Sequence, residues 1–562
     1  MLPSIAGHST PKSTGQGTLY FRNLIGAADR SVPADRLVSH VARPLLRGIS
    51  VICDLRFGSD CDLDSGGREQ PSRSACAARQ ASNSQRYFFW SVAYGLEPTP
   101  NGNCKDFMKE LRPSIAGSRL PSIVATSALG GVLGGLFAAA LDLGVMSMLK
   151  RVLAVVSSQV AWVLILMPLL GLALSVLLLY GFGLSSATQG LPPGETKAQP
   201  PRWARVWRTF PPRAARADLT GDLVAFAGEE DRFPWRLAPI RLLAIIATVG
   251  LGAAMGTEAP AAYLGVATGA ALGDRWWDRL VRPLAVGGGA AGVAVLMGIP
   301  LVGTLYILEL GRRHHAPLNA ERVTAALVGG LVGWLLNISL GVDLIRLVVP
   351  KEPPHTWYQG IITALIIGAL SGSITSISGA AIYRAKGWQA HPIVRLALGG
   401  LALAGAAVIL AVIAAPSAAV GPGGGAITWA ENTRASAPTV LAVALLRAVA
   451  TTSSAAAGGC GGLFVPFMAI GDLGGRVFAP SLGVPDDLAG SAGAAGGISG
   501  GYHLPFTAIA MVLGVGGPKL AMLTCLATVA AAGFAGRGAA WLLDRILGPG
   551  PAIEYRAYPP QQ

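Results

Sequence analysis

The sequence predicts an all-α polytopic membrane protein built as an inverted repeat, and three observations support this fold class. Of the 562 residues, 52% are hydrophobic and only 13% charged, whereas a soluble domain carries about a quarter charged residues. Long apolar segments follow one another from residue 119 to 545, and they are continuous rather than alternating, which favours helices over a β-barrel. Gly- and Pro-rich breaks interrupt short segments once in each half, a pattern typical of broken half-helices that meet at the membrane midplane.

The first half is expected to contain two spanning helices followed by shorter, broken ones. Its apolar segments are 120–148, 152–180, 239–255, 258–273 and 284–310. The first two are long enough to cross a bilayer, and the polar, Pro- and Arg-rich stretch 184–238 is expected to be a loop. Residues 284–310 are expected to break at Gly298-Ile299-Pro300, because Gly and Pro disfavour a helix interior.

The second half repeats this pattern of long helices and short pieces. Its apolar segments are 321–349, 357–383, 392–416, 437–453, 467–480, 486–499, 505–516 and 518–545. The Gly-rich stretch 421–425 separates two of them, and a Gly/Pro break lies at 458–466.

The composition also suggests how the chain is organised. Residues 1–118 are rich in Ser, Arg, Gly and Asn and hold no stretch that could span a bilayer, so we expect a poorly ordered extension on the cytoplasmic side. Residues 119–550 form the expected transport domain, with 190–235 as an inserted basic loop and 551–562 as a short tail.

The net charge of +14 does not require a nucleic-acid partner. Arg and Lys lie in the loops, where the positive-inside rule places them on the cytoplasmic side of a membrane. We therefore expect a multi-pass protein of the bacterial inner (plasma) membrane. The six cysteines form no CxxC pair, so neither a zinc site nor another metal or cofactor is predicted.

Glu258 is the main candidate functional residue. It lies in Gly256-Thr257-Glu258-Ala259-Pro260, between two apolar segments, and no other acid occurs between Asp231 and Asp274. A carboxylate at membrane depth is costly and usually marks an ion pathway. The alternative is a structural acid paired with Arg241.

The second break, Gly461-Gly462-Leu463-Phe464-Val465-Pro466, is a candidate anion site. Gly and Pro free the backbone N–H groups that open a half-helix, and such groups bind an anion without a mobile cation. The alternative is helix packing, because small residues in apolar helices more often make packing contacts.

These two breaks resemble motifs of the CLC family of chloride channels and proton/chloride exchangers. The first resembles the family pattern G-x-E-x-P and the second G-x-[IL]-F-x-P. Three further stretches agree in order: Pro239-Ile240-Arg241, Gly298-Ile299-Pro300-Leu301-Val302-Gly303 followed by Glu309, and His503-Leu504-Pro505-Phe506-Thr507-Ala508-Ile509. The resemblance covers roughly residues 119–550.

The resemblance implies roles for individual residues. Glu258 would be the gating glutamate, because a carboxylate mimics chloride and its protonation opens the path. Gly256, Gly462, Leu463 and Phe464 would bind the anion. The family fold also implies a homodimer with one pathway in each subunit.

The sequence departs from the family at three places. Phe182 stands where a serine of the first anion motif is expected, so Ser185 is the candidate hydroxyl. Leu310 replaces the inner acid of the exchangers, which leaves Glu309 as the candidate proton relay. The pore tyrosine aligns with Ile553, and Tyr555 is the candidate substitute.

The function predicted from the sequence is transmembrane transport of chloride or a similar small anion through a glutamate-gated pathway. The missing inner acid slightly favours a passive channel, and the alternative is a proton-coupled chloride exchanger. A secondary transporter of another small anion is a more remote alternative. A membrane enzyme ranks last, because no HExxH, GxSxG or paired catalytic carboxylates occur in the apolar region.

Overall fold

A computed structural model describes the helical part of the chain. The described residues are 120–157, 161–182, 219–220, 223, 233–276, 280–312, 316, 318–342, 354, 356–387, 392–433, 435–516 and 523–547. All of them belong to one compact unit. The expected extension 1–118, the tail 551–562 and nearly all of the expected basic loop 190–235 lie outside these residues.

The first half begins with one very long helix. Its helices are α5 (Leu120–Ser157), α6 (Ala161–Phe182), α8 (Ala238–Gly250), α9 (Glu258–Trp276), α10 (Val281–Met297), α11 (Pro300–Arg312) and α12 (Ala320–Leu340), with the short 3-10 turn η3 (Trp235–Leu237) before α8. The sequence-based end of the first helix at residue 148 is wrong, because α5 continues through Lys150 and Arg151. Both residues are exposed and are good helix formers.

Glycines set the ends of other first-half helices. The break expected at 298–300 is confirmed, since α10 ends at Gly298, whose φ is +62°. The segment expected to run to residue 349 ends as a helix at Leu340, because Gly341 follows in the left-handed conformation with φ +63°. Both are helix ends of the kind that glycine favours.

Within the described residues, the second half contains nine α-helices, two more than the first. They are α13 (Trp357–Gly387), α14 (Pro392–Ile413), α15 (Pro416–Ala419), α16 (Gly424–Asn432), α17 (Ala437–Ala456), α18 (Phe464–Leu482), α19 (Asp486–Gly501), α20 (Pro505–Gly516) and α21 (Leu523–Leu547). The short α16 was not expected, because the glycines at 421–425 masked the start of a helix at Gly424.

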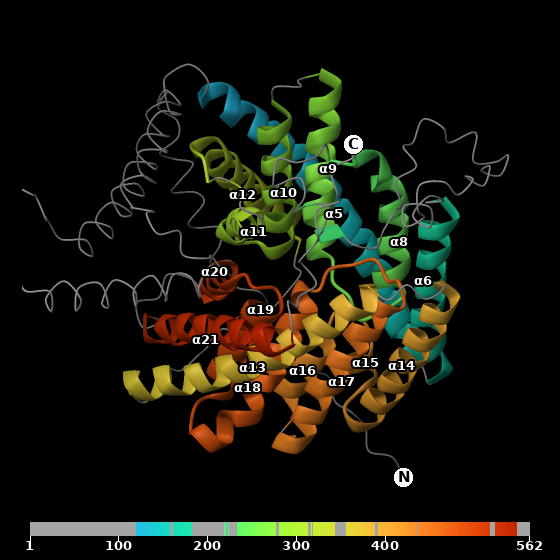
Figure 1. The fold of residues 1–562 in the computed structure, drawn as a ribbon, viewed down its shortest axis with the longest axis vertical. Coiled ribbons are helices and arrows are strands. Elements are labelled where there is room, and N and C mark those ends of the chain that lie inside the picture. Colours follow the sequence, from blue (N-terminus) through green and yellow to red (C-terminus); the bar gives the residue numbers. More distant parts are fainter. Residues whose placement is uncertain are drawn as a thin grey trace, which may run out of the picture. The chain divides into compact units, whose positions relative to one another are not determined.

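The helices around the two breaks match between the halves, as expected for an inverted repeat. In the first half, α10 packs against α5, α9 and α12; in the second, α19 packs against α13, α18 and α21. The break between α8 and α9 is as long as the break between α17 and α18. Figure 1 shows α9 to α12, in green to yellow-green, on one side and α13, α18, α19 and α21 on the other, whereas α6 lies beside α14.

Glycine allows the same close helix contact in both halves. A Cβ at Gly265 on α9 would collide with the backbone of Gly288 on α10, and a Cβ at Gly493 on α19 would collide with the backbone of Gly471 on α18. Small residues permit this approach where the bilayer supplies no hydrophobic drive for helix association.

Within the described part of the chain, seven helices are long and apolar enough to cross a membrane. The chain is therefore a multi-pass membrane protein. At 38 residues, α5 is about 57 Å long, at 1.5 Å per residue. That exceeds the roughly 30 Å hydrocarbon core, so α5 tilts in the bilayer or projects beyond it.

Candidate functional site

The two breaks are joined to each other by their backbones. The N–H of Gly256 donates to the carbonyl of Gly462 at 2.8 Å, and the N–H of Gly462 donates to the carbonyl of Gly256 at 2.7 Å. This isolated antiparallel bridge is the only β-type pairing among the described residues. It places the N-termini of α9 and α18, each the positive end of a helix dipole, beside one another.

The bridge decides which amides remain available to an anion. The N–H groups of Gly256 and Gly462, two residues expected to bind the ion, are donated to each other's carbonyls. Leu463 is the N-cap of α18, and no side chain caps this helix. The amides of Leu463 and Phe464 follow directly after the bridge, and the start of a helix leaves its first N–H groups without intrahelical partners.

Glu258 is the first residue of α9 and its side chain is 3% exposed. Its carboxyl group lies against Gly256, where a Cβ would collide with Oε2, so a larger residue at this position would have to displace the Glu258 carboxyl group. The carboxyl group faces the amides of Thr257, of Glu258 itself and of Val465. Oε2 has no hydrogen-bond partner among the described residues.

The amide of Val465 belongs to α18, so the Glu258 carboxyl group reaches the N-termini of both half-helices. An anion at this point would meet the same amides as the carboxylate does. The geometry thus allows a carboxylate and a small anion to compete for one place.

The alternative role of Glu258 as the partner of Arg241 has no support. No ion pair joins these two residues in the described part of the chain. The buried guanidinium of Arg241 instead lies over the ring of Tyr263, with its Cζ 5.0 Å from the ring centroid.

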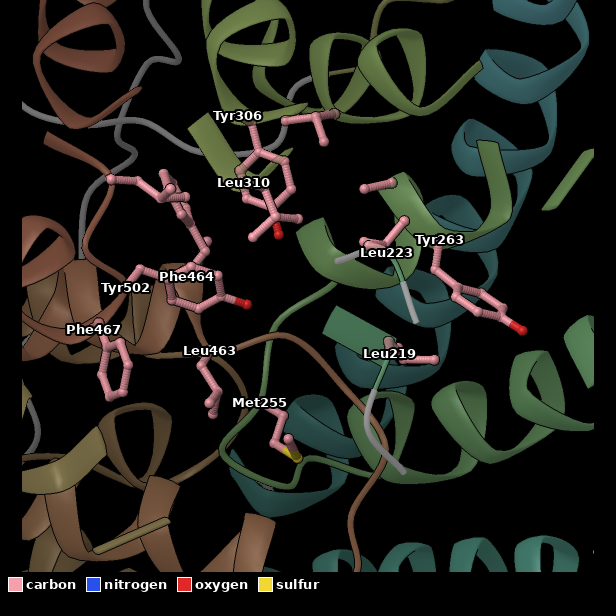
Figure 2. Close-up of a cluster of buried hydrophobic side chains, with 14 of the residues drawn as sticks. Leu219, Leu223, Met255, Tyr263, Tyr306, Leu310, Leu463, Phe464, Phe467 and Tyr502 are labelled. Atoms are coloured by element: carbon pink, nitrogen blue, oxygen red, sulfur yellow. The ribbon is translucent and has the colours of Figure 1, made fainter. Parts of the chain in front are cut away.

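A cluster of buried aromatic rings adjoins the second break. Ring centroids are 6.0 Å apart for Tyr306 and Phe464, 6.0 Å for Phe464 and Tyr502, and 6.3 Å for Tyr306 and Tyr502. In Figure 2 the hydroxyl groups of Tyr306 and Tyr502 point toward the same space, on the side of Leu463. The sequence analysis missed both tyrosines because it searched for the pore tyrosine only near the end of the chain.

The Tyr502 hydroxyl is the polar group of this cluster closest to the second break. Tyr502 is 1% exposed, and its hydroxyl interacts with the Leu463 amide and lies 3.3 Å from the Thr220 hydroxyl. The neighbouring Tyr306 hydroxyl is buried and interacts with the Tyr502 hydroxyl. These two hydroxyls are candidate donors to an anion held at Leu463.

Glu309 lies at a helix end rather than at the break. Its carboxylate accepts hydrogen bonds from the amides of Phe506 at 3.0 Å and Thr507 at 2.6 Å, and from the Thr507 hydroxyl. It therefore caps the N-terminus of α20. The next residue, Leu310, is an apolar core residue at 2% exposure.

Asp142 is a further acid that the sequence analysis missed. It lies on α5, is 1% exposed, and its Oδ1 accepts a hydrogen bond from the Thr257 hydroxyl at 2.8 Å. A lone acid inside an apolar segment was the signal that could have revealed it.

Three predicted site residues cannot be placed. Ser185 and Tyr555 lie outside the described residues, as does the side chain of Phe182, although Phe182 itself ends α6. No group of three His, Cys, Asp or Glu side chains that could hold a metal ion occurs in the part of the chain that the structure describes.

Comparisons with known proteins all point to one family of chloride-transporting proteins. The family model for the voltage gated chloride channel matches residues 203–536. An H(+)/Cl(-) exchange transporter ClcA of Yersinia pestis is 24% identical over 418 residues, covering 70% of this chain and 79% of that protein. A ClcA of Salmonella paratyphi A is 26% identical over 256 residues, covering 44% and 54%.

Two solved structures share the fold. A slow cyanobacterial Cl-/H+ antiporter has a TM-score of 0.56 at 19% identity, covering 76% of this chain and 99% of its own. A CLC-type fluoride/proton antiporter has a TM-score of 0.54 at 23% identity, covering 74% and 95%.

Proposed function

The chain belongs to the voltage-gated chloride channel (CLC) family, and from this premise we propose that it exchanges chloride or a similar small anion for protons across the membrane. Anion transport follows from the family and the membrane-spanning fold. The family gives no support to a membrane enzyme. Proton coupling, the alternative from the sequence, is preferred over the passive channel because the curated relatives are named H(+)/Cl(-) exchange transporters.

One observation carries the proposal: the buried Glu258 carboxyl group lies at the joined N-termini of α9 and α18. As an anion it takes the place that a chloride ion would take, and it blocks the path. When it is protonated, the attraction to the helix N-termini is lost and the anion can enter. One group thus binds the proton and excludes the anion, which is the basis of exchange.

The anion itself is proposed to bind at the start of α18. The amides of Leu463 and Phe464 would donate to it, and the Tyr502 hydroxyl, which interacts with the Leu463 amide, would add a third donor. Gly256 and Gly462 would hold the two half-helices in position through their bridge. Such fixed donors replace the hydration of the ion at membrane depth.

A passive channel remains the second candidate function, and one observation favours it. Leu310 stands where the family's exchangers carry an inner acid, and Glu309 beside it caps α20. In either case we propose a homodimer with one pathway in each subunit, as the family fold implies.

Flux measurements on the protein in lipid vesicles test this proposal. A chloride gradient should drive proton uptake, and chloride flux should rise as pH falls, because acid protonates the gate. Glu258→Gln imitates the protonated form and should abolish both proton uptake and pH dependence while chloride still moves. Glu321→Gln, at the start of α12, makes the same chemical change away from the breaks and should alter neither.

The outcomes separate the candidates. Chloride flux without proton uptake in the unmodified protein would favour the channel. Unchanged pH dependence in Glu258→Gln would refute the assignment of the gate. Parallel measurements with fluoride would show whether the site prefers chloride or a smaller anion.

A further inference from the structure

Asp142 is a second buried carboxyl group beside the first break. Its Oδ1 accepts the hydrogen bond from Thr257, and its Oδ2 is buried without a hydrogen-bond partner among the described residues. An ionised carboxylate in such a place is costly unless other charges or donors compensate it.

Asp142 is linked to the gate through the chain itself. Its hydrogen-bond partner Thr257 directly precedes Glu258, and α5 packs along α9. The two carboxyl groups also interact electrostatically. Two carboxyl groups that interact in a low dielectric do not ionise independently, so their protonation steps belong to the pair.

The other charged groups near Asp142 do not compensate its charge fully. Lys150 interacts with it, but lies eight positions further along α5, about 12 Å along the helix axis. The groups that interact with Asp142 are Thr257, Lys150 and Glu258. The charged side chains on the other helices packed against α5 are Arg241 on α8, Asp274 and Arg275 on α9, Arg282 on α10, and Glu321 and Arg322 on α12.

We propose that Asp142 and Glu258 form an electrostatically coupled acid pair, in which Asp142 sets the pH at which the gate takes up its proton. Asp142 acts as a positioning residue through Glu258, and the Thr257 hydroxyl holds it in place. The proposal rests on the proposed role of Glu258.

The pH profile of chloride flux tests this pair. In Asp142→Asn, the negative neighbour that disfavours ionised Glu258 is gone, so the gate keeps its charge down to lower pH. The pH of half-maximal flux should therefore fall by about one unit or more, the size of coupling at which two sites titrate as a pair. Asp274→Asn, at the other end of α9, is the matched control and should leave the profile unchanged.

Two further variants keep the proposal testable. In the Glu258→Gln background, Asp142→Asn should have no additional effect on the pH profile. Thr257→Val removes the hydrogen bond to Asp142 and should lower the half-maximal pH by a smaller amount, whereas Thr257→Ser keeps the hydroxyl and should not. This second pair carries the test should Asp142→Asn fail to fold.

Each outcome bears on the pair or on the gate separately. An unchanged half-maximal pH in Asp142→Asn, with only a lower melting temperature, would make Asp142 a structural partner of Thr257 and overturn the proposal. An unchanged profile in Thr257→Val would overturn it as well. If Glu258→Gln alone keeps its pH dependence, the proposed function fails whatever Asp142 does.

Discussion

The two breaks share a backbone but differ in chemistry. Gly256-Thr257-Glu258-Ala259-Pro260 and Gly462-Leu463-Phe464-Val465-Pro466 align residue for residue, and their glycines pair with each other. The first break carries two acids, Glu258 and the adjoining Asp142. The second carries apolar residues at the same positions, with Phe464 in the place of Glu258.

This difference divides the work of the site between the two halves. The apolar second break leaves helix amides without competing charges, which suits an anion. The acidic first break supplies a proton acceptor at the same point. On the proposed function, a repeated backbone thus brings an anion-binding group and a proton-binding group together where the two breaks meet. The two breaks differ in their side chains alone.

The largest difference between the halves is expected from alanine at the two paired glycines. In Gly256→Ala the new Cβ would collide with the Glu258 carboxyl group, whereas in Gly462→Ala it would meet the Ala259 amide nitrogen at 3.1 Å. Overpacking of this kind costs about 1–3 kcal/mol, so Gly256→Ala should displace the gate and remove most of the pH dependence of flux. Gly462→Ala should keep that dependence, as measured in vesicles at several pH values. An equal loss of pH dependence in both variants would contradict the position of the Glu258 carboxyl group against Gly256.

A smaller effect is expected at the second break. Tyr502→Phe removes one hydroxyl beside the Leu463 amide, and one hydrogen bond is worth about 1 kcal/mol. The chloride concentration for half-maximal flux should rise roughly fivefold, while the pH profile stays unchanged. Tyr263→Phe, which also removes a buried hydroxyl but beside Arg241, is the control.

Bromide bound in a crystal should lie near the amides of Leu463 and Phe464, and density only at surface loops would refute the site.

The sequence predicted the breaks but not how they meet. Gly and Pro act locally, so the start of α9 at Glu258 was read correctly, and the start of α18 was placed within a few residues. The bridge from Gly256 to Gly462 is a contact between distant parts of the chain, which periodicity does not reveal. The same reason hid Tyr502, which reaches Leu463 from another helix end.

Local charge was also misleading at the end of the first helix. Lys150 and Arg151 suggested a helix end, although both continue α5 with exposed side chains. Glu309 was predicted as a proton relay because it directly precedes Leu310, which stands in place of the inner acid. That role stays a prediction. The contacts of Glu309 with Phe506 and Thr507 became visible only once α11 and α20 were placed together.

Glu309 provides a third comparison between the halves, with an effect on stability. The equivalent position of α20, counted from its first proline, is Gly514, so only the first half carries an acid there. Glu309→Gln weakens bonds to an ionised acceptor, each worth about 1.5–3 kcal/mol. The melting temperature should fall while the number of protons exchanged per chloride stays constant. Loss of proton uptake at unchanged stability would instead identify Glu309 as the inner relay.

The smallest effect is expected outside both halves. Removal of residues 1–115, which lie beyond the described part of the chain, should leave folding and chloride flux within about twofold of the full chain, since this composition offers little apolar surface for docking. Size-exclusion chromatography and vesicle flux provide the measurements. A truncated protein that loses its dimer or its flux would show that the extension is part of the transport unit.

The bridge between Gly256 and Gly462 has a consequence for how the protein is made. A ribosome delivers Gly256 to the membrane long before Gly462 exists, so the first half must wait with an unpaired break at membrane depth. Unsatisfied backbone groups there are unfavourable, and the late arrival of the second break relieves them. The proposed anion site therefore needs both halves of the chain before its two half-helices can be joined.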